Sequence, residues 1–530
     1  SKSIPALLAL VSAFAASSPA EETIAANWPR IWPYPAAFSN GTSTISVDPA
    51  CNFVVVSKTG KPSPDIEAAI ERFKARVFQH RLPKAGNANG GVAKVAITVS
   101  DPSAEIQLET DESYALQVPA SDTGTITIDA ATQVGAMHAL ESLAQLIQFD
   151  FGTKAYKLGG APWKIMDVPR FPHREILVDS ARHFQPLRML KRILDSMSYA
   201  KVNVMHWHLT DSQSFPFESK SFPLLINGAY SEQERYTVED VEDVIEHARQ
   251  RGIRVVVEID TPGHAAAMCH GYPEVCPSAQ CTQPLNPTTN KTFEVLAGLF
   301  SDLTGNKRGA GLFFDNMMHL GGDEVNTKCW TESPEISAWL KARNMTADDG
   351  YLYMVQKAQA IAHQNGRDVI GWEEIWNKFG TKLDKSTVIQ QWLPKSNAAK
   401  EATAAGYRVL WSTDGVWYLD GLKVNWTTMY SQEPCEGLSD DVCSKLVLGG
   451  GGEMWGETAD ASDVLQTIWP RMAAIGERLW SPRAINSTAA AAPRLSSFRC
   501  LLNKWGIPAA PPGNDVAREA PHGPGSCYAQ

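Results

Sequence analysis

The sequence predicts an α/β protein in which a (β/α)8 TIM barrel follows a smaller α+β domain. Three observations predict this fold. Short apolar segments alternate with amphipathic helices from about residue 166 onward. Eight such segments are present, which is the number that closes a barrel. The first segment leads into DSARHF (179–184) rather than into the glycine-rich phosphate turn that a doubly wound open sheet would need. The chain of 530 residues is long enough for both domains.

The N-terminal domain is expected to span residues 21–165. Its strands are predicted from β-branched and alternating segments, and its two helices from apolar residues at helical spacing. The predicted strands are 42–48, 51–57, 91–100 and 124–129, and the predicted helices are 65–81 and 129–149.

The barrel is expected to span residues 166–500. Its strands are short and almost wholly apolar, as in a parallel sheet that helices cover on the outside. The helices between them show apolar residues three and four apart, for example Leu190, Ile193, Leu194 and Met197. The predicted strands are 174–180, 201–209, 254–260, 317–322, 368–372, 387–392, 408–413 and 445–452.

Composition excludes several classes of partner. Hydrophobic residues make up 44% of the chain and charged residues 20%, as in an ordinary globular protein. The net charge is −10 and there is no basic run, so neither nucleic acid nor an anionic membrane surface is an expected partner. Sixteen Trp residues are a heavy load and favour a site that binds the flat face of a ligand.

The first 20 residues resemble a secretory signal peptide. Lys2 precedes a thirteen-residue apolar stretch (4–16), too short to cross a bilayer as a helix, and small residues follow it. No second apolar span follows, so we expect no membrane-spanning segment. Export to the secretory pathway, and then to the cell exterior or to a lysosome or vacuole, is the expected localisation. Five N-glycosylation tripeptides agree with export: Asn40, Asn290, Asn344, Asn425 and Asn486.

The nine cysteines favour disulfides in an oxidising compartment. Zinc is the alternative, but the chain has no C-x2-C pair. Cys51 is left over as a free thiol. The expected pairs are Cys269–Cys276, Cys281–Cys329, Cys435–Cys443 and Cys500–Cys527, the last tying a C-terminal tail (501–530) to the barrel.

Polar and aromatic residues follow nearly every predicted barrel strand. Because the carboxyl ends of barrel strands meet at one mouth, these side chains are expected to form one site. The set comprises Arg182, Asp211, His264, Asp323, Glu324, Trp372, Glu373, Trp392, Tyr418, Asp420, Trp455 and Glu457.

The acidic pair Asp323-Glu324 is the strongest catalytic candidate. On an extended segment the two side chains would point to opposite sides and flank one small target. Gly321 and Gly322 before them allow an unusual turn. Several Trp residues at neighbouring strand ends would wall a ring-shaped ligand, so the set fits a sugar better than a nucleotide: Trp372, Trp392, Trp411, Trp417 and Trp455.

Two histidines raise a metal alternative. His206 and His208 share one face of a strand, as ligand pairs do in barrel metallohydrolases. They lie inside the strand, however, and core histidines with satisfied hydrogen bonds are the favoured interpretation. No metal and no cofactor is therefore expected. His264 lies past its strand and is the better functional candidate.

From about Val178 to Cys500 the chain resembles the β-N-acetylhexosaminidases of glycoside hydrolase family 20, of the eukaryotic lysosomal and secreted type. The matching motifs occur in one order: DSARHF (179–184), HWHLTDSQSFP (206–216), DTPGH (260–264), HLGGDE (319–324), GWEEIW (371–376), QQW (390–392), WYLD (417–420) and MWGE (454–457). The N-terminal segment resembles the small non-catalytic domain of that family.

The resemblance implies hydrolysis of terminal, non-reducing β-linked N-acetylglucosamine or N-acetylgalactosamine with retention of configuration. Most retaining glycosidases use a carboxylate nucleophile, but in this family the 2-acetamido oxygen of the substrate attacks. Glu324 would be the general acid and base, with a pKa raised by apolar walls, and Asp323 would orient the acetamido group. Tyr418 would donate a hydrogen bond to the acetamido oxygen.

The resemblance also implies the binding residues. Trp372 and Trp392 would wall the acetyl methyl group, and Trp455 would stack under the sugar ring. His264 would link to Asp211 or Glu324. The outer hydroxyls would be held by Arg182, Asp211, Asp420 and Glu457. Partners would be oligosaccharides or glycoconjugates that end in an N-acetylhexosamine, and a homodimer is common in the family.

Two positions depart from the family pattern. Ser212 follows Asp211 where many lysosomal members have a second acid, and little catalytic effect is expected. Gly421 stands where members that accept negatively charged sugars carry a basic residue, which predicts a preference for neutral substrates. A catalytically silent sugar-binding protein of the same fold is the alternative function, although it would have no need of the acid Glu324.

Overall fold

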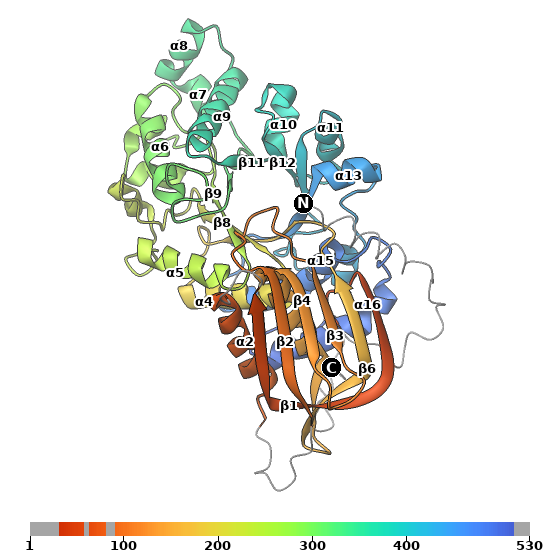
Figure 1. Cartoon of the computed structure of the whole chain (residues 1–530). Coiled ribbons are helices and arrows are strands. Elements are labelled where there is room, and N and C mark those ends of the chain that lie inside the picture. Colours follow the sequence, from red (N-terminus) through yellow and green to blue (C-terminus); the bar gives the residue numbers. More distant parts are fainter. Residues whose placement is uncertain (1–30, 58–62, 81–90, 514–530) are drawn as a thin grey trace.

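The computed structural model describes residues 31–57, 63–80 and 91–513, and within them it confirms the barrel. Eight parallel strands close in the order β10-β11-β12-β13-β14-β7-β8-β9. Figure 1 shows the barrel and its helices above the N-terminal sheet. The predicted signal peptide (1–20) and the tail beyond residue 513 lie outside the described residues.

Each barrel strand matches one of the eight predicted segments. The strands are β7 (His173–Asp179), β8 (Val204–Thr210), β9 (Arg254–Ile259), β10 (Met317–His319), β11 (Asp368–Trp372), β12 (Val388–Gln391), β13 (Arg408–Trp411) and β14 (Val447–Met454). Every residue of β7, β8, β9 and β14 is buried, because side chains fill the barrel on one face and helices cover the other.

Most helices outside the barrel bury an apolar face against it, although α13 (Asp440–Leu446) buries none of its residues. Helix α5 (Val238–Arg249) begins at a capping box in which Thr237 and Asp240 satisfy each other's free backbone groups, and its buried face includes Val241 and Val244. The other helices of this part are α4 (Leu187–Tyr199), α6 (Asn290–Thr304), α7 (Lys328–Glu332), α8 (Pro334–Ala342), α9 (Ala347–Gln364), α10 (Glu373–Phe379), α11 (Ala398–Ala404), α12 (Trp426–Tyr430), α13 (Asp440–Leu446), α14 (Val464–Ile468), α15 (Arg471–Trp480) and α16 (Thr488–Lys504).

The N-terminal domain is a six-stranded sheet in the order β1-β2-β4-β3-β6-β5, with helices α2 (Pro64–Val77) and α3 (Gln133–Leu146) packed on each other. The strands are β1 (Ala37–Ser57), β2 (Val92–Asp101), β3 (Tyr114–Val118), β4 (Ile126–Thr132), β5 (Ile147–Asp150) and β6 (Ala155–Asp167). β1 pairs with both β2 and β6.

Two expectations for this domain are wrong, and three of its strands were missed. The two strands predicted over 42–57 are one strand, β1, whose register shifts between Val47 and Asn52. The helix predicted from residue 129 starts only at Gln133, because the preceding residues pair with β2 and β3 and Thr132 caps the helix. Strands β3, β5 and β6 were not predicted; β6 contains two glycines and a proline, which hide its strand pattern.

Buried ion pairs join the two domains. Arg174 on β7 contacts the Glu112 carboxylate at 2.5 and 3.0 Å, and Lys201 contacts Asp167 at 2.9 Å. Burial opposes ionisation of Glu112, but the Arg174 guanidinium and a 2.8 Å hydrogen bond to His138 together outweigh it and lower the Glu112 pKa to about 2. Because these charges are almost fully removed from water, loss of one partner would leave the other as an unpaired buried charge and destabilise the domain contact.

Three of the four expected disulfides are present. Cys269–Cys276, Cys281–Cys329 and Cys435–Cys443 have Cα–Cα distances of 5.9, 5.8 and 5.6 Å. Cys51 is a buried free thiol. Cys527 lies outside the described residues, so the fourth pair stays a prediction.

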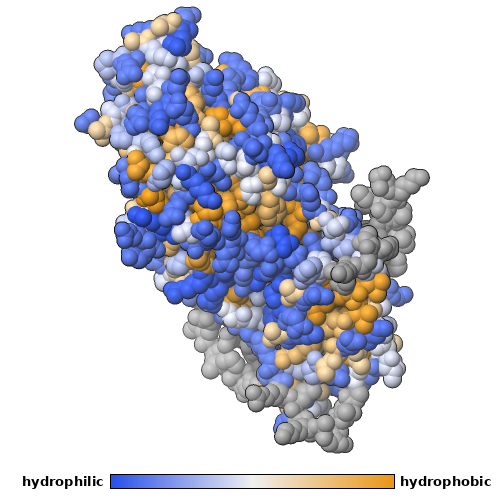
Figure 2. Space-filling view, turned by 60° about the vertical axis from the view of Figure 1, so that its left-hand side comes forward, coloured by the Kyte–Doolittle hydropathy of each residue, from blue (hydrophilic) through white to orange (hydrophobic). Residues whose placement is uncertain are grey.

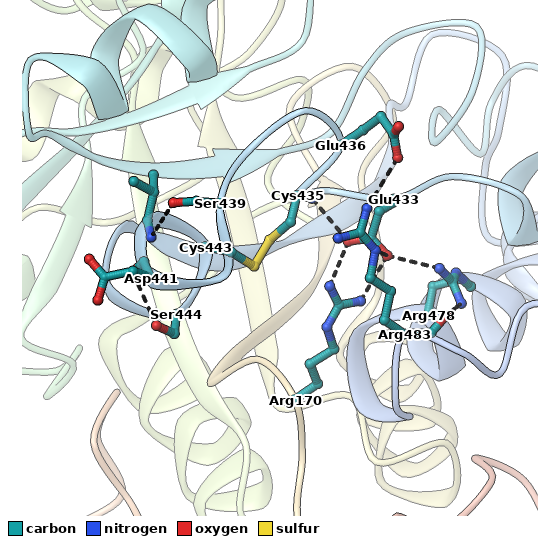
Figure 3. The surroundings of a disulfide bond; sticks show 11 residues. Arg170, Glu433, Cys435, Glu436, Ser439, Asp441, Cys443, Ser444, Arg478 and Arg483 are labelled. Carbon is teal, nitrogen blue, oxygen red and sulfur yellow. Dashed lines mark hydrogen bonds and ion pairs between the residues drawn. A yellow bond between two sulfur atoms is a disulfide. The ribbon is translucent and has the colours of Figure 1, made fainter.

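Figure 3 shows the Cys435–Cys443 disulfide beside a cluster of arginines. Glu433 accepts hydrogen bonds from Arg170, just before β7, at 2.6 and 2.9 Å, and forms an ion pair of 3.0 Å with Arg478 of α15. The disulfide loop therefore connects the entrance of the first barrel strand to a helix near the end of the barrel.

The surface carries features that bear on localisation. All five predicted glycosylation asparagines are exposed: Asn40, Asn290, Asn344, Asn425 and Asn486. Figure 2 shows a largely hydrophilic face interrupted by separate hydrophobic patches. Among the described residues, no helix has the length and apolar character that a bilayer crossing requires.

Candidate active site

The acidic pair lies on a tight turn after β10, not on the extended segment that we expected. Gly321, Gly322 and Glu324 all have positive φ (62°, 95° and 50°). A Cβ at Gly321 would lie 1.9 Å from Asp260 Oδ1, so only glycine fits this turn. The turn brings the Asp323 and Glu324 carboxylates to one side, because each lies 3.5 Å from Nε2 of His264.

The two acids differ in environment. The Asp323 side chain is 11% exposed, and its buried Oδ1 atom has no hydrogen-bond partner in the part of the chain that the structure describes. The Glu324 side chain is 62% exposed. Its hydrogen bond to His264 lowers the Glu324 pKa, so the expectation of a raised pKa is wrong for the free site: the histidine, not apolar walls, dominates this carboxyl.

His264 connects the acids to Asp211. Its Nδ1 atom lies 3.2 Å from Asp211 Oδ2. Burial disfavours the imidazolium, but Asp211 and Glu324 outweigh that cost and raise the His264 pKa to about 12. His264 is therefore a cation at the mouth of the barrel.

Asp211 is buried rather than open to substrate. Its Oδ2 atom is 2.8 Å from His208 Nε2 and 2.8 Å from Arg182 Nη2. With both neighbours and His264 already on this carboxylate, Asp211 orients the charged side chains of the site. That Asp211 also binds outer hydroxyls stays a prediction.

Arg182 is held by three carboxylates. Besides Asp211, its Nη1 atom contacts Asp179 Oδ2 at 2.9 Å and Glu457 Oε1 at 3.9 Å. Its guanidinium carbon lies 5.1 Å from the centre of the Trp455 ring. Since Glu457 is half exposed and Arg182 is fixed, the pair presents a donor and an acceptor beside an aromatic face.

Four aromatic residues from successive strand ends lie together. The Trp372 and Trp455 ring centres are 5.9 Å apart, Trp392 stacks on Tyr418 at 6.2 Å, and Tyr418 lies 6.4 Å from Trp455. Indole N–H groups are anchored: Trp392 donates to Glu374 at 2.8 Å. Burial raises the Tyr418 pKa well above its usual value, so its hydroxyl stays a hydrogen-bond donor.

Two of the expected aromatic walls belong elsewhere. Trp417 is fully buried and donates to the Met429 carbonyl at 3.0 Å, and Trp411 packs edge-on against it at 4.5 Å. They fill the space behind the neighbouring Tyr418. Asp420 follows with a buried, unpartnered Oδ1 atom, and burial raises its pKa to about 6.

A charged cluster below the mouth was missed by sequence reasoning. Glu258 on β9 is fully buried and lies 3.0 Å from both His206 and His319. His208 lies 2.5 Å from the same carboxylate. Acidic residues inside the apolar strands, such as Glu175 and Glu258, are the signal that could have revealed it.

Two groups of side chains have the spacing of a metal site. Ligand atoms of His206, Glu258 and His319 lie within 4.8 Å of one another, as do those of Asp260, His264 and Asp323. Burial opposes charge on His206, but Glu258 and Glu175 raise its pKa to about 10, and a protonated imidazole has no lone pair for a metal. Burial lowers the pKa of His319, so this imidazole is neutral beside the Glu258 carboxylate. The absence of a metal stays a prediction.

Comparisons with known proteins identify relatives along most of the chain. Residues 171–483 match the family model described as glycosyl hydrolase family 20, catalytic domain, and residues 31–146 match one described as beta-acetyl hexosaminidase like. Beta-hexosaminidase 1 of Arabidopsis thaliana is 44% identical over 99% of this chain and 97% of its own length. The beta-hexosaminidase subunit beta of Homo sapiens is 33% identical over 95% of this chain and 92% of its own.

A solved structure shares the fold. The exo beta-N-acetylglucosaminidase of Vibrio harveyi, in complex with N-acetylglucosamine, superposes with a TM-score of 0.79 and 25% identity. The match covers 94% of this chain and 81% of that one.

Proposed function

Because this chain belongs to glycosyl hydrolase family 20 and is a β-N-acetylhexosaminidase, we propose that it uses the acetamido group of its substrate as the nucleophile. The enzyme would remove terminal, non-reducing β-linked N-acetylglucosamine or N-acetylgalactosamine with retention of configuration. No protein side chain would form a covalent bond to the sugar. The similarity to beta-hexosaminidases supports the hydrolase activity. The geometry of the site supports the role that is assigned to each residue in the two steps of the reaction.

One observation carries the proposal: among the described residues, no N–H group or hydroxyl donates to the buried Oδ1 atom of Asp323, and the Asp260 carboxyl is an acidic neighbour of this side chain. A carboxylate oxygen left unsatisfied in a buried position costs free energy, so such an atom awaits a donor. The acetamido N–H of the substrate is such a donor. By accepting it, Asp323 would turn the carbonyl oxygen toward the anomeric carbon and stabilise the positive charge of the closing ring.

Glu324 would supply the proton. In the first step the acetamido carbonyl oxygen forms a bond to C1 while the bond from C1 to the leaving oxygen breaks, and the Glu324 proton passes to that oxygen. In the second step Glu324 takes a proton from water, which bonds to C1 and opens the oxazolinium ring. Glu324 then carries its proton again, so the cycle closes.

The lowered pKa of Glu324 sets a condition on the first step. The acid is exposed in the free site, and a bound sugar would remove water from it and raise its pKa. We therefore infer that protonated Glu324 is favoured in the complex and in an acidic compartment. The exposed glycosylation tripeptides and the disulfides support a secretory route to such a compartment or to the cell exterior.

The remaining residues would bind and orient the sugar. Trp372 and Trp392 would hold the acetyl group, and Trp455 would lie under the ring. Tyr418 would donate to the acetamido oxygen. Outer hydroxyls would contact Arg182, Glu457 and the unpartnered oxygen of Asp420. An internal nucleophile gains effective concentration from such orientation.

The test compares a chromogenic β-N-acetylglucosaminide with the matching β-glucoside. The proposal expects the first to be cleaved and the second to be left intact, because only the first carries the acetamido nucleophile. Glu324→Gln and Asp323→Asn should each lower kcat by about 10² to 10⁴-fold. Cleavage of both substrates at similar rates, or full activity of Asp323→Asn, would overturn the proposal. An inactive wild-type chain that still binds N-acetylglucosamine would favour the sugar-binding alternative.

Chelator provides a second test. Full activity after exhaustive chelation is expected, whereas loss of activity and its return with a divalent ion would favour the metal alternative through His206 and His208. The homodimer also stays a proposal, and light scattering of the purified chain would decide it.

A further inference from the structure

Glu258 occupies a central position in the barrel. It lies on β9, it is fully buried, and no part of the proposed chemistry uses it. Its two carboxylate oxygens have different neighbours. Oε1 accepts a hydrogen bond from the indole N–H of Trp372 at 3.0 Å, and Oε2 lies 2.5 Å from Nδ1 of His208.

The Oε2 side leads to the general acid. His208 Nε2 is 2.8 Å from Asp211 Oδ2, and that oxygen is 3.2 Å from Nδ1 of His264. The other ring nitrogen of His264 lies 3.5 Å from Glu324. A continuous chain of charged groups therefore runs from the barrel interior to the mouth.

The Oε1 atom of Glu258 contacts Trp372, the residue proposed to pack against the acetamido nucleophile of the substrate. Trp372 ends β11, and among the described residues its indole N–H donates to the Glu258 oxygen alone. The indole is fully buried and packs against His319 at 4.6 Å and Trp455 at 5.9 Å. The orientation of this ring therefore depends on where Glu258 holds it.

Glu258 remains charged despite its burial. Burial by itself would raise the Glu258 pKa, but His319, His208 and His206 lower it well below the usual value. A buried charge is costly unless it is paired. Glu453, a buried carboxyl on β14, shows the opposite outcome: burial and the nearby Glu175 raise its pKa well above normal, so it is a neutral acid.

We propose that Glu258 is a positioning residue whose two oxygens jointly orient the Trp372 indole and the His208–Asp211–His264 chain that ends at Glu324. Glu258 fixes Trp372, which would contact the acetamido group, relative to His264, which contacts the general acid Glu324. It does so without touching substrate. The proposal rests on the proposed function, because Trp372 and Glu324 must serve the same reaction. Beyond that function, the proposal assigns to Glu258 the orientation of both Trp372 and Glu324.

The first experiment compares Glu258→Gln with Glu453→Gln. A glutamine has one acceptor oxygen, so it can keep Trp372 or His208 but not both, and its NH2 group faces histidine donors. We expect kcat/KM for a β-N-acetylglucosaminide to fall by about 10²-fold, the loss found when catalytic groups are displaced. Glu453→Gln replaces a neutral acid with a neutral amide of the same shape, so activity is expected within about 2-fold of wild type.

Double-mutant cycles separate positioning from general destabilisation. Trp372→Phe removes the indole N–H contact together with part of the ring packing, and His264→Gln breaks the chain toward Glu324. If Glu258 acts through both, each second substitution in the Glu258→Gln background costs at least about 5-fold less than it does in wild type. Losses that multiply independently in both cycles would overturn the proposal.

The nature of the leaving group provides an independent readout. A dinitrophenyl leaving group needs little protonation, whereas a methylumbelliferyl leaving group needs more. With the dinitrophenyl substrate, Glu258→Gln should recover the part of its loss that arises from a misplaced Glu324, and Trp372→Phe should recover none of its loss. Equal losses with both leaving groups in Glu258→Gln would contradict the link to Glu324.

If Glu258→Gln does not fold, the Trp372→Phe and His264→Gln cycle alone decides the question. Glu258 joins the two side chains in the proposal, and Trp455 with Arg182 forms a second connection that does not include Glu258. The double variant should therefore lose less than the product of the single losses, both in wild type and in a Trp455→Phe background. Independent losses there would again overturn it. An inactive wild-type enzyme would instead refute the proposed function, so the two failures are distinguishable.

Discussion

Replacement of His264 by glutamine tests the electrostatics of the acid directly. The histidine is a cation whose Nε2 lies 3.5 Å from Glu324, and this contact lowers the Glu324 pKa. Glutamine keeps a polar side chain but removes the charge. The pKa of Glu324 should therefore rise.

The size of the rise follows from Coulomb's law. Glu324 is 62% exposed, so the dielectric constant of water is the appropriate limit. Two unit charges 3.5 Å apart then interact by about 1.2 kcal/mol, which equals about 0.9 pH unit. A general acid must be protonated to act, so activity is lost on the alkaline side above its pKa.

The assay is the pH dependence of kcat/KM, which reports groups of the free enzyme. We expect the alkaline limb of His264→Gln to lie about 0.9 unit higher than that of wild type, with a lower maximum because Glu324 loses its anchor. His247→Gln is the matched control. His247 lies on the outer helix α5, 3.0 Å from Asp195 of α4, so its replacement should not move the alkaline limb of the pH profile. An alkaline limb that stays in place or moves to lower pH in His264→Gln would refute the reasoning.

Three further predictions concern specificity, positioning and stability. Gly421→Arg should raise turnover of a 6-sulfated N-acetylglucosaminide relative to the unsulfated sugar, whereas wild type should favour the neutral one; comparable wild-type turnover of both would contradict this. Glu374→Ala leaves the Trp392 N–H without its acceptor at 2.8 Å, so kcat/KM should fall by about 10-fold, measured by steady-state kinetics, and an unchanged value would mean that the ring is held otherwise. Glu112 has a folded-state pKa of about 2, below its unfolded value, so its pairing with Arg174 contributes stability above about pH 4.5 that is lost as the pH falls toward 2. Glu112→Gln should remove about 3 kcal/mol of unfolding free energy at pH 7 and little at pH 2, measured in denaturant, and an equal loss at both pH values would exclude the ion pair as the cause.

The barrel could be predicted because its strands are buried on both faces. Every residue of β8 is buried, and only a run of apolar or paired residues satisfies such a strand. The N-terminal sheet was harder. Whether residues 129–132 continue β4 or begin α3 depends on partners in β2 and β3, which are distant in sequence, and the helical pattern of the neighbouring residues extends across them.

The candidate site was predictable only in part. Asp323 and Glu324 follow a strand and stand out, but the turn that brings both to His264 depends on positive φ at three positions, which sequence does not specify. Glu258 could not be placed, because its contacts are with the neighbouring strands β8 and β10 and with β11 beyond them, which are distant in sequence. A charged residue inside an apolar strand is the signal to follow in such cases.

The measurement that tests the central claim most directly varies the nucleophile itself. A series of aryl β-glucosaminides whose N-acyl group carries zero to three fluorine atoms makes the carbonyl oxygen progressively less nucleophilic while leaving the sugar ring unchanged. If that oxygen attacks C1, log kcat/KM falls steeply and steadily along the series. A flat dependence, or a glycosyl ester found on a side chain of the enzyme by mass spectrometry, would contradict the account.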